Sequence, residues 1–527
     1  MNAILRCFGC FVLSLGCIAG TPAAAAEKPN VLLICVDDLK PLLGCYGDAT
    51  VQSPSIDRLA ARGVLFERAF CNQAVCAPSR NALMTGLRPT TLGIYDLETF
   101  FRKAAPDAVT LGQHFRQHGY RAEALGKIFH VGHGNHDDAV SWSVPHWSPK
   151  GGGYALPENA GRAAKPAAKP KPASPPKGAA TECADVPDST YADGKIADEA
   201  IRRLRAAKEK PGEPFFLAVG FLKPHLPFVA PKKYWDLYRR EAFKLPALQT
   251  PPQGAPAFAP TNWGELRAYS DIPETGPLSD QQKLHLIHGY HAATSYMDAQ
   301  LGRLLDALDE TGFAQNTIVV LWGDHGWHLG DHGMWCKHTN YEQAARIPLI
   351  VAAPGVAQAA RRNGDAASRN GDAASITSLE GDEKSRELPI LAASPFRKTG
   401  ALVETVDIYP TLCELAGLPA PKGLDGASFA AALRNPEAAT KEAVFHAYPR
   451  APRGMGPIVG RAVRTARYRL VEWKKPGAAS ETAVLELYDY EKDPEETKNL
   501  AAERPEVVAQ LRKILAAQPE AKPQVGK

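Results

Sequence analysis

The sequence predicts an α/β protein with a large, mostly parallel central sheet flanked by helices, followed by a smaller C-terminal domain built on an antiparallel sheet. Three observations predict this fold. The chain has 527 residues, which suits one large domain and a smaller one. Short apolar runs alternate with stretches of helical periodicity, the pattern of a parallel sheet covered on both faces. Beyond residue 440 the texture changes to short, closely spaced strand candidates.

The large domain is expected to span residues 27–440. Its first strand is an unbroken apolar run, 31–36, that stops at two aspartates, as a buried strand of such a sheet does. Further strands are expected over 120–125, 215–219, 317–322 and 349–352. Apolar residues at helical spacing predict helices over 55–61, 110–118, 193–208 and 281–309.

Residues 441–527 are the predicted smaller domain. Strand candidates cover 443–448, 459–465, 468–472 and 484–488, and a last helix covers about 505–516. Two segments break the pattern of the large domain. Residues 161–180 are rich in Ala, Lys and Pro, and a second segment near 357–388 contains the heptad Arg-Asn-Gly-Asp-Ala-Ala-Ser twice in tandem. We expect both to be disordered surface insertions, because their composition cannot supply a core.

The N-terminal residues 1–26 are typical of a secretory signal peptide. Arg6 is the positive charge, residues 7–19 are an apolar stretch too short to span a bilayer, and the alanine run ends at Ala26, where cleavage is expected. A lipoprotein signal ending at Cys17 is the second alternative. The expected location is therefore periplasmic or secreted, without stable membrane insertion. The net charge of +4 and the absence of a clustered basic face give no basis for nucleic-acid binding.

Acidic pairs follow two of the predicted strands. Asp37 and Asp38 come after the first strand, and Asp324 and His325 come after the strand 317–322. In open α/β sheets ligands bind at the carboxyl ends of strands. Adjacent carboxylates are costly without a cation, so a hard divalent ion with oxygen ligands, such as calcium, is expected here. Either pair by itself would be read as a solvated turn.

A competing metal site is read from the histidine spacing. His325, His328 and His332 could bind zinc through ring nitrogens. Glycines at 326, 330 and 333 place these histidines in a loop rather than on one helix face, which favours the calcium interpretation. Metal analysis separates the two.

Cys76 opens the run Cys-Ala-Pro-Ser-Arg at 76–80. Pro78 suits the first turn of a helix, which would place the cysteine beside amides that favour anions, and Arg80 can reach back to the same point. Two other interpretations stay open: a structural thiol, and a Cys71–Cys76 disulfide that would consume the nucleophile. Seven cysteines remain after the signal segment, and their spacing shows no disulfide framework.

Four more polar residues follow predicted strands or the histidine loop and are candidates to hold an anionic group: Lys127, His130, His225 and Lys337. Together with the acidic pairs and the cysteine run, these residues resemble the motifs of type I sulfatases, within the alkaline-phosphatase-like superfamily. The residues that match the family motifs lie in the segments 36–39, 73–80, 125–130, 223–228, 323–327, 335–337, 486–489 and 493–494. Within the family the chain is most similar to the iduronate-2-sulfatase type. The resemblance covers nearly the whole mature length and implies an alkaline-phosphatase-like sandwich.

The resemblance also implies a mechanism. A maturation enzyme converts Cys76 to formylglycine, and one hydroxyl of its hydrate attacks sulfur. The alcohol leaves, and the sulfated hemiacetal collapses to aldehyde and free sulfate. One Ca²⁺ would be bound by Asp37, Asp38, Asp324 and His325 together with the matured Cys76.

By the same resemblance Lys127, His225 and Lys337 would hold the sulfate, and Arg80 and His130 would support the hydrate. His225 is the candidate acid for the leaving alcohol and Asp324 the candidate base. The expected partner is a sulfated polysaccharide or oligosaccharide, with 2-O-sulfated uronic acid as the expected sugar. Two alternatives stay open. One is a phosphate or phosphonate monoester hydrolase of the same superfamily; the other is a non-catalytic glycan-binding protein with an unmatured Cys76.

Overall fold

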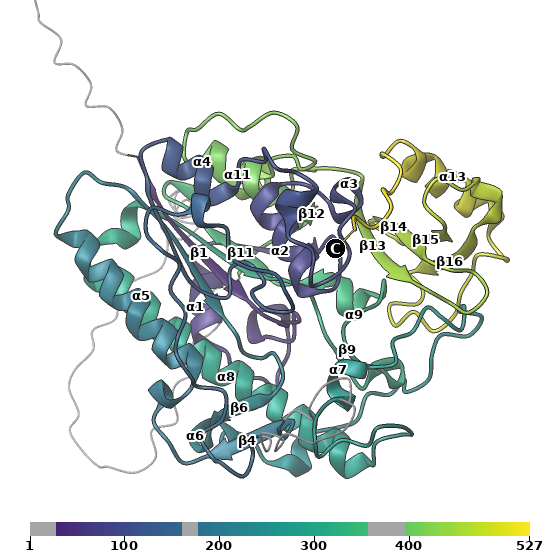
Figure 1. The fold of residues 1–527 in the computed structure, drawn as a ribbon, viewed down its shortest axis with the longest axis horizontal. Helices are drawn as coiled ribbons and strands as arrows, with labels where there is room; N and C mark the ends of the chain where they lie inside the picture. Colours follow the sequence, from purple (N-terminus) through teal and green to yellow (C-terminus); the bar gives the residue numbers. More distant parts are fainter. Residues whose placement is uncertain (1–27, 161–177, 357–395, 527) are drawn as a thin grey trace, which may run out of the picture.

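The structure is a computed structural model that describes residues 28–160, 178–356 and 396–526 (Figure 1). The predicted signal peptide, most of the first predicted insertion and all of the second lie outside the described residues. In the described part, no helix has the length and apolar character needed to cross a membrane.

The central sheet has eight strands in the order β10-β2-β11-β7-β1-β5-β3, with β12 beside β2. Their bounds are β1 Asn30–Val36, β2 Val64–Phe70, β3 Arg121–Gly126, β5 Phe215–Phe221, β7 Thr317–Gly323, β10 Arg346–Ile347, β11 Leu349–Ala352 and β12 Arg397–Glu404. β1 pairs in parallel with β5 and β7, and β3 pairs in parallel with β5. The predicted α/β class with a mostly parallel sheet is therefore confirmed.

One predicted strand runs against the expected direction. β11 pairs antiparallel with both β7 and β2. The chain between β7 and β11 contains only two-residue strands and one-turn helices, so it makes no helical crossover to the other end of the sheet. β11 therefore enters the sheet from the end at which β7 leaves it.

Helices cover both faces of this sheet (Figure 1). On one face lie α2 (Cys76–Thr85), α4 (Leu111–Gln117) and α11 (Ile408–Leu415), and on the other lie α1 (Pro54–Arg62), α5 (Ala192–Lys208) and α8 (Asp280–Glu310). β1 supplies Val31, Leu33 and Cys35 to the first apolar cluster and Leu32, Ile34 and Val36 to the second. Burial on both faces is why this strand is apolar at every position instead of alternating.

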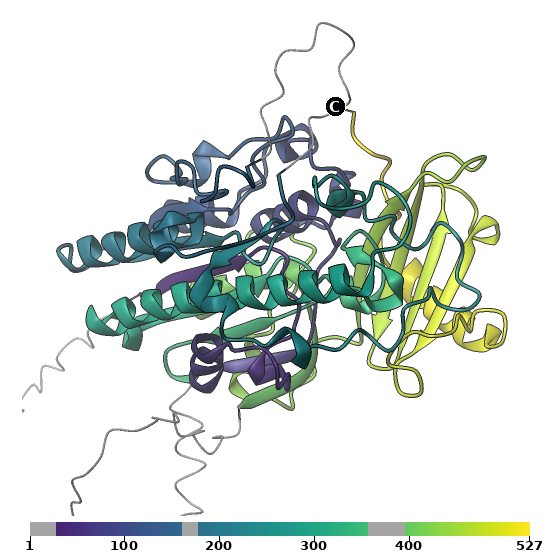
Figure 2. The same cartoon turned by 90° about the horizontal axis from the view of Figure 1, so that it is seen from below.

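The second, smaller sheet has four antiparallel strands in chain order: β13 Ala443–Arg450, β14 Ile458–Thr465, β15 Tyr468–Lys474 and β16 Val484–Asp489. Helix α13 (Pro505–Ala516) covers one face through an apolar cluster that includes Val463, Leu470 and Leu511. The opposite face of this sheet is turned toward the large domain (Figure 2). There Trp473 and Tyr488 share an apolar cluster with Val75 and Tyr341. The residue before Cys76 is thus held in place by the smaller sheet.

The other α-helices and strands of the described residues are short: α3 Pro89–Leu92, α6 Lys232–Trp235, α7 Gly264–Arg267, α9 Glu342–Ala345, α12 Ala430–Arg434, β4 Thr181–Ala184, β6 Phe228–Pro231, β8 His328–Leu329 and β9 Trp335–Cys336. β4 corrects the end of the first predicted insertion. Ala180 is fully buried, its amide donates to Asp271 Oδ1 at 2.8 Å, and its carbonyl accepts from the Phe228 amide at 2.8 Å. Residues 178–180 therefore belong to the folded part, because they lead directly into β4.

Candidate active site

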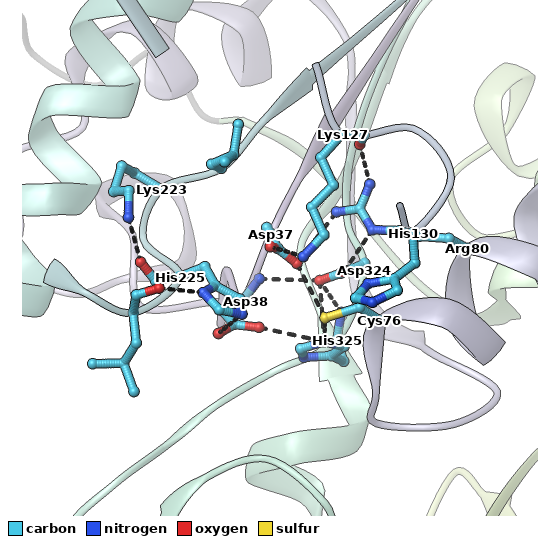
Figure 3. A network of polar contacts seen from close by, with 12 residues as sticks. Asp37, Asp38, Cys76, Arg80, Lys127, His130, Lys223, His225, Asp324 and His325 are labelled. Carbon is cyan, nitrogen blue, oxygen red and sulfur yellow. Dashed lines mark hydrogen bonds and ion pairs between the residues drawn. The ribbon is translucent and has the colours of Figure 1, made fainter. Parts of the chain in front are cut away.

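The predicted site residues converge at the carboxyl ends of β1 and β7, facing the start of α2 (Figure 3). Val36 is paired with Gly323 in the parallel register, so the acidic residues that follow the two strands leave the sheet side by side. The Asp38 amide donates to Asp324 Oδ1 at 3.0 Å. Asp38 has φ 61°, a left-handed conformation that costs energy for a residue with a side chain and is found at functional turns.

Cys76 is the first residue of α2 and is buried among these carboxylates. Its Sγ lies 3.4 Å from Asp37 Oδ1 and 3.5 Å from His325 Nε2. Burial, together with the negative charge of Asp37, raises the pKa of the Cys76 thiol. The unmodified thiol would therefore be a poor nucleophile, because the thiolate is the reactive form. All seven described cysteines are free, so the Cys71–Cys76 disulfide is not formed.

The donor set fits a hard divalent cation. Ligand atoms of Asp37, Cys76, Asp324 and His325 all lie within 4.8 Å of one another. His325 Nδ1 lies 3.0 Å from the Gly326 carbonyl oxygen, which accepts its proton and leaves the Nε2 lone pair facing the carboxylates. His325 Nε2 is 3.4 Å from Asp38 Oδ1 and 3.4 Å from Asp324 Oδ1. Three buried carboxylates at this spacing repel one another, and calcium prefers such oxygen donors.

The three-histidine zinc site is wrong as one site. His328 and His332 form a separate buried group with Asp331. Both ring nitrogens of His328 are engaged, Nδ1 with Asp331 Oδ2 and Nε2 with Thr339 Oγ1 at 2.8 Å. His332 Nε2 lies 2.8 Å from the Glu495 carbonyl oxygen. The glycine-rich loop turns His325 toward the carboxylates and the other two histidines away from them.

Arg80 and Lys127 bring positive charge to the same carboxylates. Arg80 is fully buried; its Nε donates to Asp324 Oδ2 at 3.0 Å and another guanidinium nitrogen donates to the Lys127 carbonyl. Lys127 Nζ donates to Asp37 Oδ2. Burial by itself lowers the pKa of Lys127, but the Asp37 carboxylate outweighs it and the pKa is raised. Both side chains therefore remain cationic beside Cys76.

Lys337 and His225 approach from the opposite side, at Asp38. Lys337 Nζ lies 2.8 Å from Asp38 Oδ1, and His225 Nε2 lies 3.9 Å from Asp38 Oδ2. Burial would lower the pKa of His225, but the charge of Asp38 outweighs it and raises the pKa to about 9. The imidazolium is therefore the form expected at neutral pH, which is the form an acid catalyst needs.

His130 lies on the Cys76 side of the site (Figure 3). Its Nε2 is 3.1 Å from His133 Nδ1. Burial and the charge of Lys127 lower the pKa of His130 to about 3, so this imidazole is neutral and can accept as well as donate a hydrogen bond. All of the residues predicted for the site are thus brought together, with Lys223 beside them, its Nζ donating to the carbonyls of His225 and Pro227 at 2.6 and 2.7 Å.

Glu265 is a charged residue of the site that was not predicted. Glu265, on the one-turn helix α7, places Oε1 3.0 Å from His225 Nε2 and Oε2 3.1 Å from Lys337 Nζ. It comes from a stretch with no strand end, motif or periodicity near it, so nothing in the sequence singles it out. Beside it lies a cavity of about 560 Å³ lined by Asn262, His338, Tyr448 and Arg450, among others.

Comparison with known proteins decides the family. The family model described as "Sulfatase" matches residues 29–418, and the model "N-sulphoglucosamine sulphohydrolase, C-terminal" matches residues 381–521. The chain belongs to the sulfatase family. It is 38% identical over 427 residues to iduronate 2-sulfatase of Mus musculus and 37% identical over 430 residues to that of Homo sapiens; each match covers 78% of this chain and 74% of the relative.

Solved structures show the same fold. One, a protein in complex with its substrate D-glucosamine-2-N,6-O-disulfate, has a TM-score of 0.67 at 21% identity and covers 93% of this sulfatase and 97% of its own chain. Another, a phosphonate monoester hydrolase of Agrobacterium radiobacter, also has a TM-score of 0.67 at 21% identity and covers 93% and 95%. The alkaline-phosphatase-like fold with a smaller C-terminal sheet is therefore confirmed. The sulfuric ester hydrolase class is confirmed by the family model and by the two iduronate 2-sulfatases.

Proposed function

We propose that this sulfatase hydrolyses the 2-O-sulfate of a uronic acid residue in a sulfated glycan, using matured Cys76 as the nucleophile and one calcium ion. The observation that carries the proposal is the surroundings of Cys76. Its Sγ is buried within 3.5 Å of Asp37 and His325, at the N-terminus of a helix and beside the cations Arg80 and Lys127. A thiol with a raised pKa is a poor nucleophile at this position. A hydroxyl of the matured residue, activated by the carboxylates, can act as the nucleophile instead.

Each side chain has a role that follows from its position. Asp37, Asp38, Asp324 and His325 would hold the calcium ion, which supplies positive charge for the sulfate oxygens and for the attacking hydroxyl. Lys127 lies on the Cys76 side and Lys337 on the Asp38 side, so the two ammonium groups can bind sulfate oxygens from two directions. The Asp324 carboxylate lies in the same cluster as Sγ of Cys76 and can accept the proton of the attacking hydroxyl.

The leaving group is assigned to the side of His225. The raised pKa of His225 keeps a proton on the ring, and this proton can pass to the bridging ester oxygen. The cavity beside Glu265 and His338 opens on this side and has room for a sugar. Its lining combines aromatic rings, such as Tyr448, with polar groups, such as Asn262, which suits a carbohydrate.

The choice of sugar rests on likeness and charge. The two iduronate 2-sulfatases share far more sequence with this chain than the structural neighbours do. A hexuronate-2-O-sulfatase of Bacteroides thetaiotaomicron is also related, at 26% identity over 505 residues. Cations on two sides of the site support a substrate that carries a carboxylate beside its sulfate. Export is part of the proposal, since the predicted signal at 1–26 would bring the enzyme to extracellular glycans. Sequencing the N-terminus of the mature protein tests this, and a start directly after Ala26 is expected. A lipid attached to Cys17 would instead indicate a lipoprotein.

A second candidate function is hydrolysis of phosphate or phosphonate monoesters, which the fold shared with a phosphonate monoester hydrolase keeps open. Both functions are tested with protein produced alongside a maturation enzyme for the Cys76 motif. Mass spectrometry of the peptide containing Cys76 should show a mass about 18 Da below that of the thiol, because the thiol is exchanged for an aldehyde. Turnover of 4-nitrophenyl sulfate above that of 4-nitrophenyl phosphate supports the sulfatase; the reverse order supports the second candidate. If the Cys76 peptide is unmodified and neither ester is turned over, the remaining interpretation is a non-catalytic glycan-binding protein.

A further inference from the structure

We infer that Glu265 is a positioning residue for His225, and that it acts on the breaking of the ester bond rather than on the attack at sulfur. The inference rests on the proposed function, in which His225 gives a proton to the leaving oxygen. Its basis is a chain of contacts: Lys337 holds the carboxylate of Glu265, and one oxygen of that carboxylate faces the reactive nitrogen of His225.

Lys337 contacts both oxygens of Glu265, donating to Oε1 at 3.3 Å, and Oε1 also contacts His225. Oε1 lies 3.0 Å from His225 Nε2, and Oε2 lies 3.1 Å from Lys337 Nζ. The side chain is only 15% exposed, so both contacts are largely shielded from water. Lys337 is itself fixed by Asp38 Oδ1 at 2.8 Å. Because Lys337 anchors the carboxylate through both oxygens, Oε1 is held at a fixed place beside His225.

The backbone that carries Glu265 is also fixed. Trp263, just before α7, has the left-handed φ of 48°, which turns the chain into the helix. The guanidinium of Arg267 lies 3.5 Å from the centre of the Trp263 ring and donates to the carbonyls of Pro273 and Gly276 at 2.9 Å each. Leu266 is buried in an apolar cluster with Trp327 and Trp335. The segment therefore presents Glu265 to the site as a rigid element.

The imidazole of His225 has acceptors at both nitrogens. Nδ1 faces the carbonyl oxygen of Leu226, and Nε2 faces Glu265. Two acceptors on opposite edges fix the plane of the ring and favour a hydrogen on each nitrogen. The hydrogen on Nε2 is then directed at Glu265 Oε1, with Asp38 Oδ2 3.9 Å from the same nitrogen, and the leaving oxygen would take it by approaching this edge of the ring. Without Glu265 only the Nδ1 contact would orient the ring.

This arrangement matters most for a poor leaving group. As the bond between sulfur and the bridging oxygen breaks, its electron pair goes to that oxygen, which takes the proton from His225 Nε2. A sugar alkoxide needs this proton, whereas 4-nitrophenolate leaves without it. The decrease in kcat/KM on removal of Glu265 should therefore grow with the basicity of the leaving group. Residues that act on the attacking side, such as Lys127, should affect all esters alike.

The test is a series of aryl sulfates whose phenols become less acidic: 4-nitrophenyl, phenyl and 4-methylphenyl sulfate. We expect Glu265→Ala to lower kcat/KM for phenyl sulfate about tenfold more than for 4-nitrophenyl sulfate, a part of the usual contribution of an acid catalyst. The loss should fall on kcat more than on KM. Glu265→Gln keeps an acceptor oxygen for Nε2 and should retain part of the effect. In a His225→Ala background, adding Glu265→Ala should not make kcat/KM depend more steeply on the acidity of the leaving phenol.

Glu274→Ala is the matched control, since Glu274 is an exposed glutamate on the same segment and should leave the series unchanged. Melting temperatures show whether each variant is folded, and the Gln variant answers the question if the Ala variant is not. An equal loss on every ester, or a further steepening in the His225→Ala background, would overturn the inference while the sulfatase stands. Failure of the wild-type enzyme to turn over any aryl sulfate would instead reject the proposed function, and the inference with it.

Discussion

The guanidinium of Arg80 lies 3.0 Å from Asp324 although 244 positions separate the two residues. Arg80 belongs to the helix that begins at Cys76, and Asp324 follows the strand β7 in the sheet centre. Ser79, its neighbour on the helix, donates its hydroxyl to the carbonyl of Asp324. Two residues of the cysteine motif thus tie the start of the Cys76 helix to the metal-ligand candidates. The motif therefore has a structural use besides the role in maturation proposed for it.

Replacing Cys76 by Ala should abolish sulfatase turnover, to less than about one part in a thousand, because no other group can take the place of the nucleophile. The fold should persist, since the change removes one sulfur from a site already crowded with polar atoms. Aryl sulfate turnover and a thermal melt measure both. Cys183→Ala is the control, because that thiol is exposed and should be dispensable. Residual activity of Cys76→Ala above a few per cent would exclude a nucleophile derived from Cys76.

Removal of the proposed calcium ion should inactivate the enzyme. We expect a chelator to abolish turnover, added calcium to restore it, and Asp37→Ala to behave like the chelated enzyme, since the carboxylates would be left without the cation that they surround. Elemental analysis should find one calcium per chain in the active form. His332→Ala should leave the calcium content unchanged, because His332 lies in the separate group with Asp331. Recovery with zinc but not with calcium would reject the assignment.

The elements that could be predicted are those whose local pattern agrees with their burial. β1 is apolar at every position, and α8 keeps its apolar residues at helical spacing over 31 residues, so both are visible in the sequence. β2 and β12 were not predicted. β2 carries Glu67 and Arg68 at its centre, and β12 begins with Arg397 and Lys398, so neither strand shows a clean apolar run. Their place in the sheet depends on pairing with distant strands.

The same distinction holds for the site. Asp37, Asp324 and Lys127 directly follow strands, and the carboxyl ends of parallel strands meet at one edge, so their proximity could be inferred. Glu265 could not be inferred, because a one-turn helix far from any strand end brings it there. Its position depends on contacts that have no local signature, such as Arg267 stacking on Trp263 and Leu266 packing into an apolar cluster.

Stability should depend on pH through Glu404. This buried carboxylate lies 2.8 Å from both Arg88 and Lys441. Burial opposes ionisation, but Lys441 and Arg88 outweigh it and lower the pKa of Glu404 from 4.5 to about 2. Because the folded-state pKa is depressed, the stabilisation is fully present above about pH 4.5 and is lost as the pH falls toward 2.

Glu404→Gln should therefore lower the free energy of unfolding at pH 7 by about 3 kcal/mol, as expected for breaking a buried ion pair. The gap from wild type should shrink as the pH is lowered to 3 in thermal or urea melts. Glu67→Gln, which removes a half-exposed partner of Lys398, should change stability by less than about 1 kcal/mol. A gap of the same size at pH 3 and pH 7 would show that charge is not what Glu404 contributes.

The first insertion should be dispensable only in part. Deleting residues 162–177 should leave turnover of an aryl sulfate and the melting temperature unchanged, because this stretch is rich in Ala, Lys and Pro and poor in core-forming side chains. Extending the deletion through Ala180 should lower the melting temperature, since it removes a buried residue hydrogen-bonded to Asp271 and Phe228. Equal melting temperatures for the two deletions would contradict the boundary seen at 178.

The substrate is tested by separating its two negative groups. We expect a 2-O-sulfated uronic acid at a non-reducing end to be the best substrate in a panel of sulfated mono- and disaccharides. The reason is the distribution of charge: Lys127 and Lys337 flank the carboxylate cluster from two sides, and the cationic His225 lies beside Lys337. A sulfate monoester carries one negative charge, which leaves positive charge for a neighbouring carboxylate.

The matched control is the same sugar with its carboxyl group reduced to an alcohol, which keeps the ring and the sulfate. Reduction should lower kcat/KM about tenfold or more, because a site built for a charged group rejects an analogue that lacks it. The difference should narrow at high salt, which screens the charge. Equal rates on the acid and the alcohol, or a preference for a neutral 6-O-sulfated sugar or for choline sulfate, would reject the uronic acid and leave the sulfatase in place.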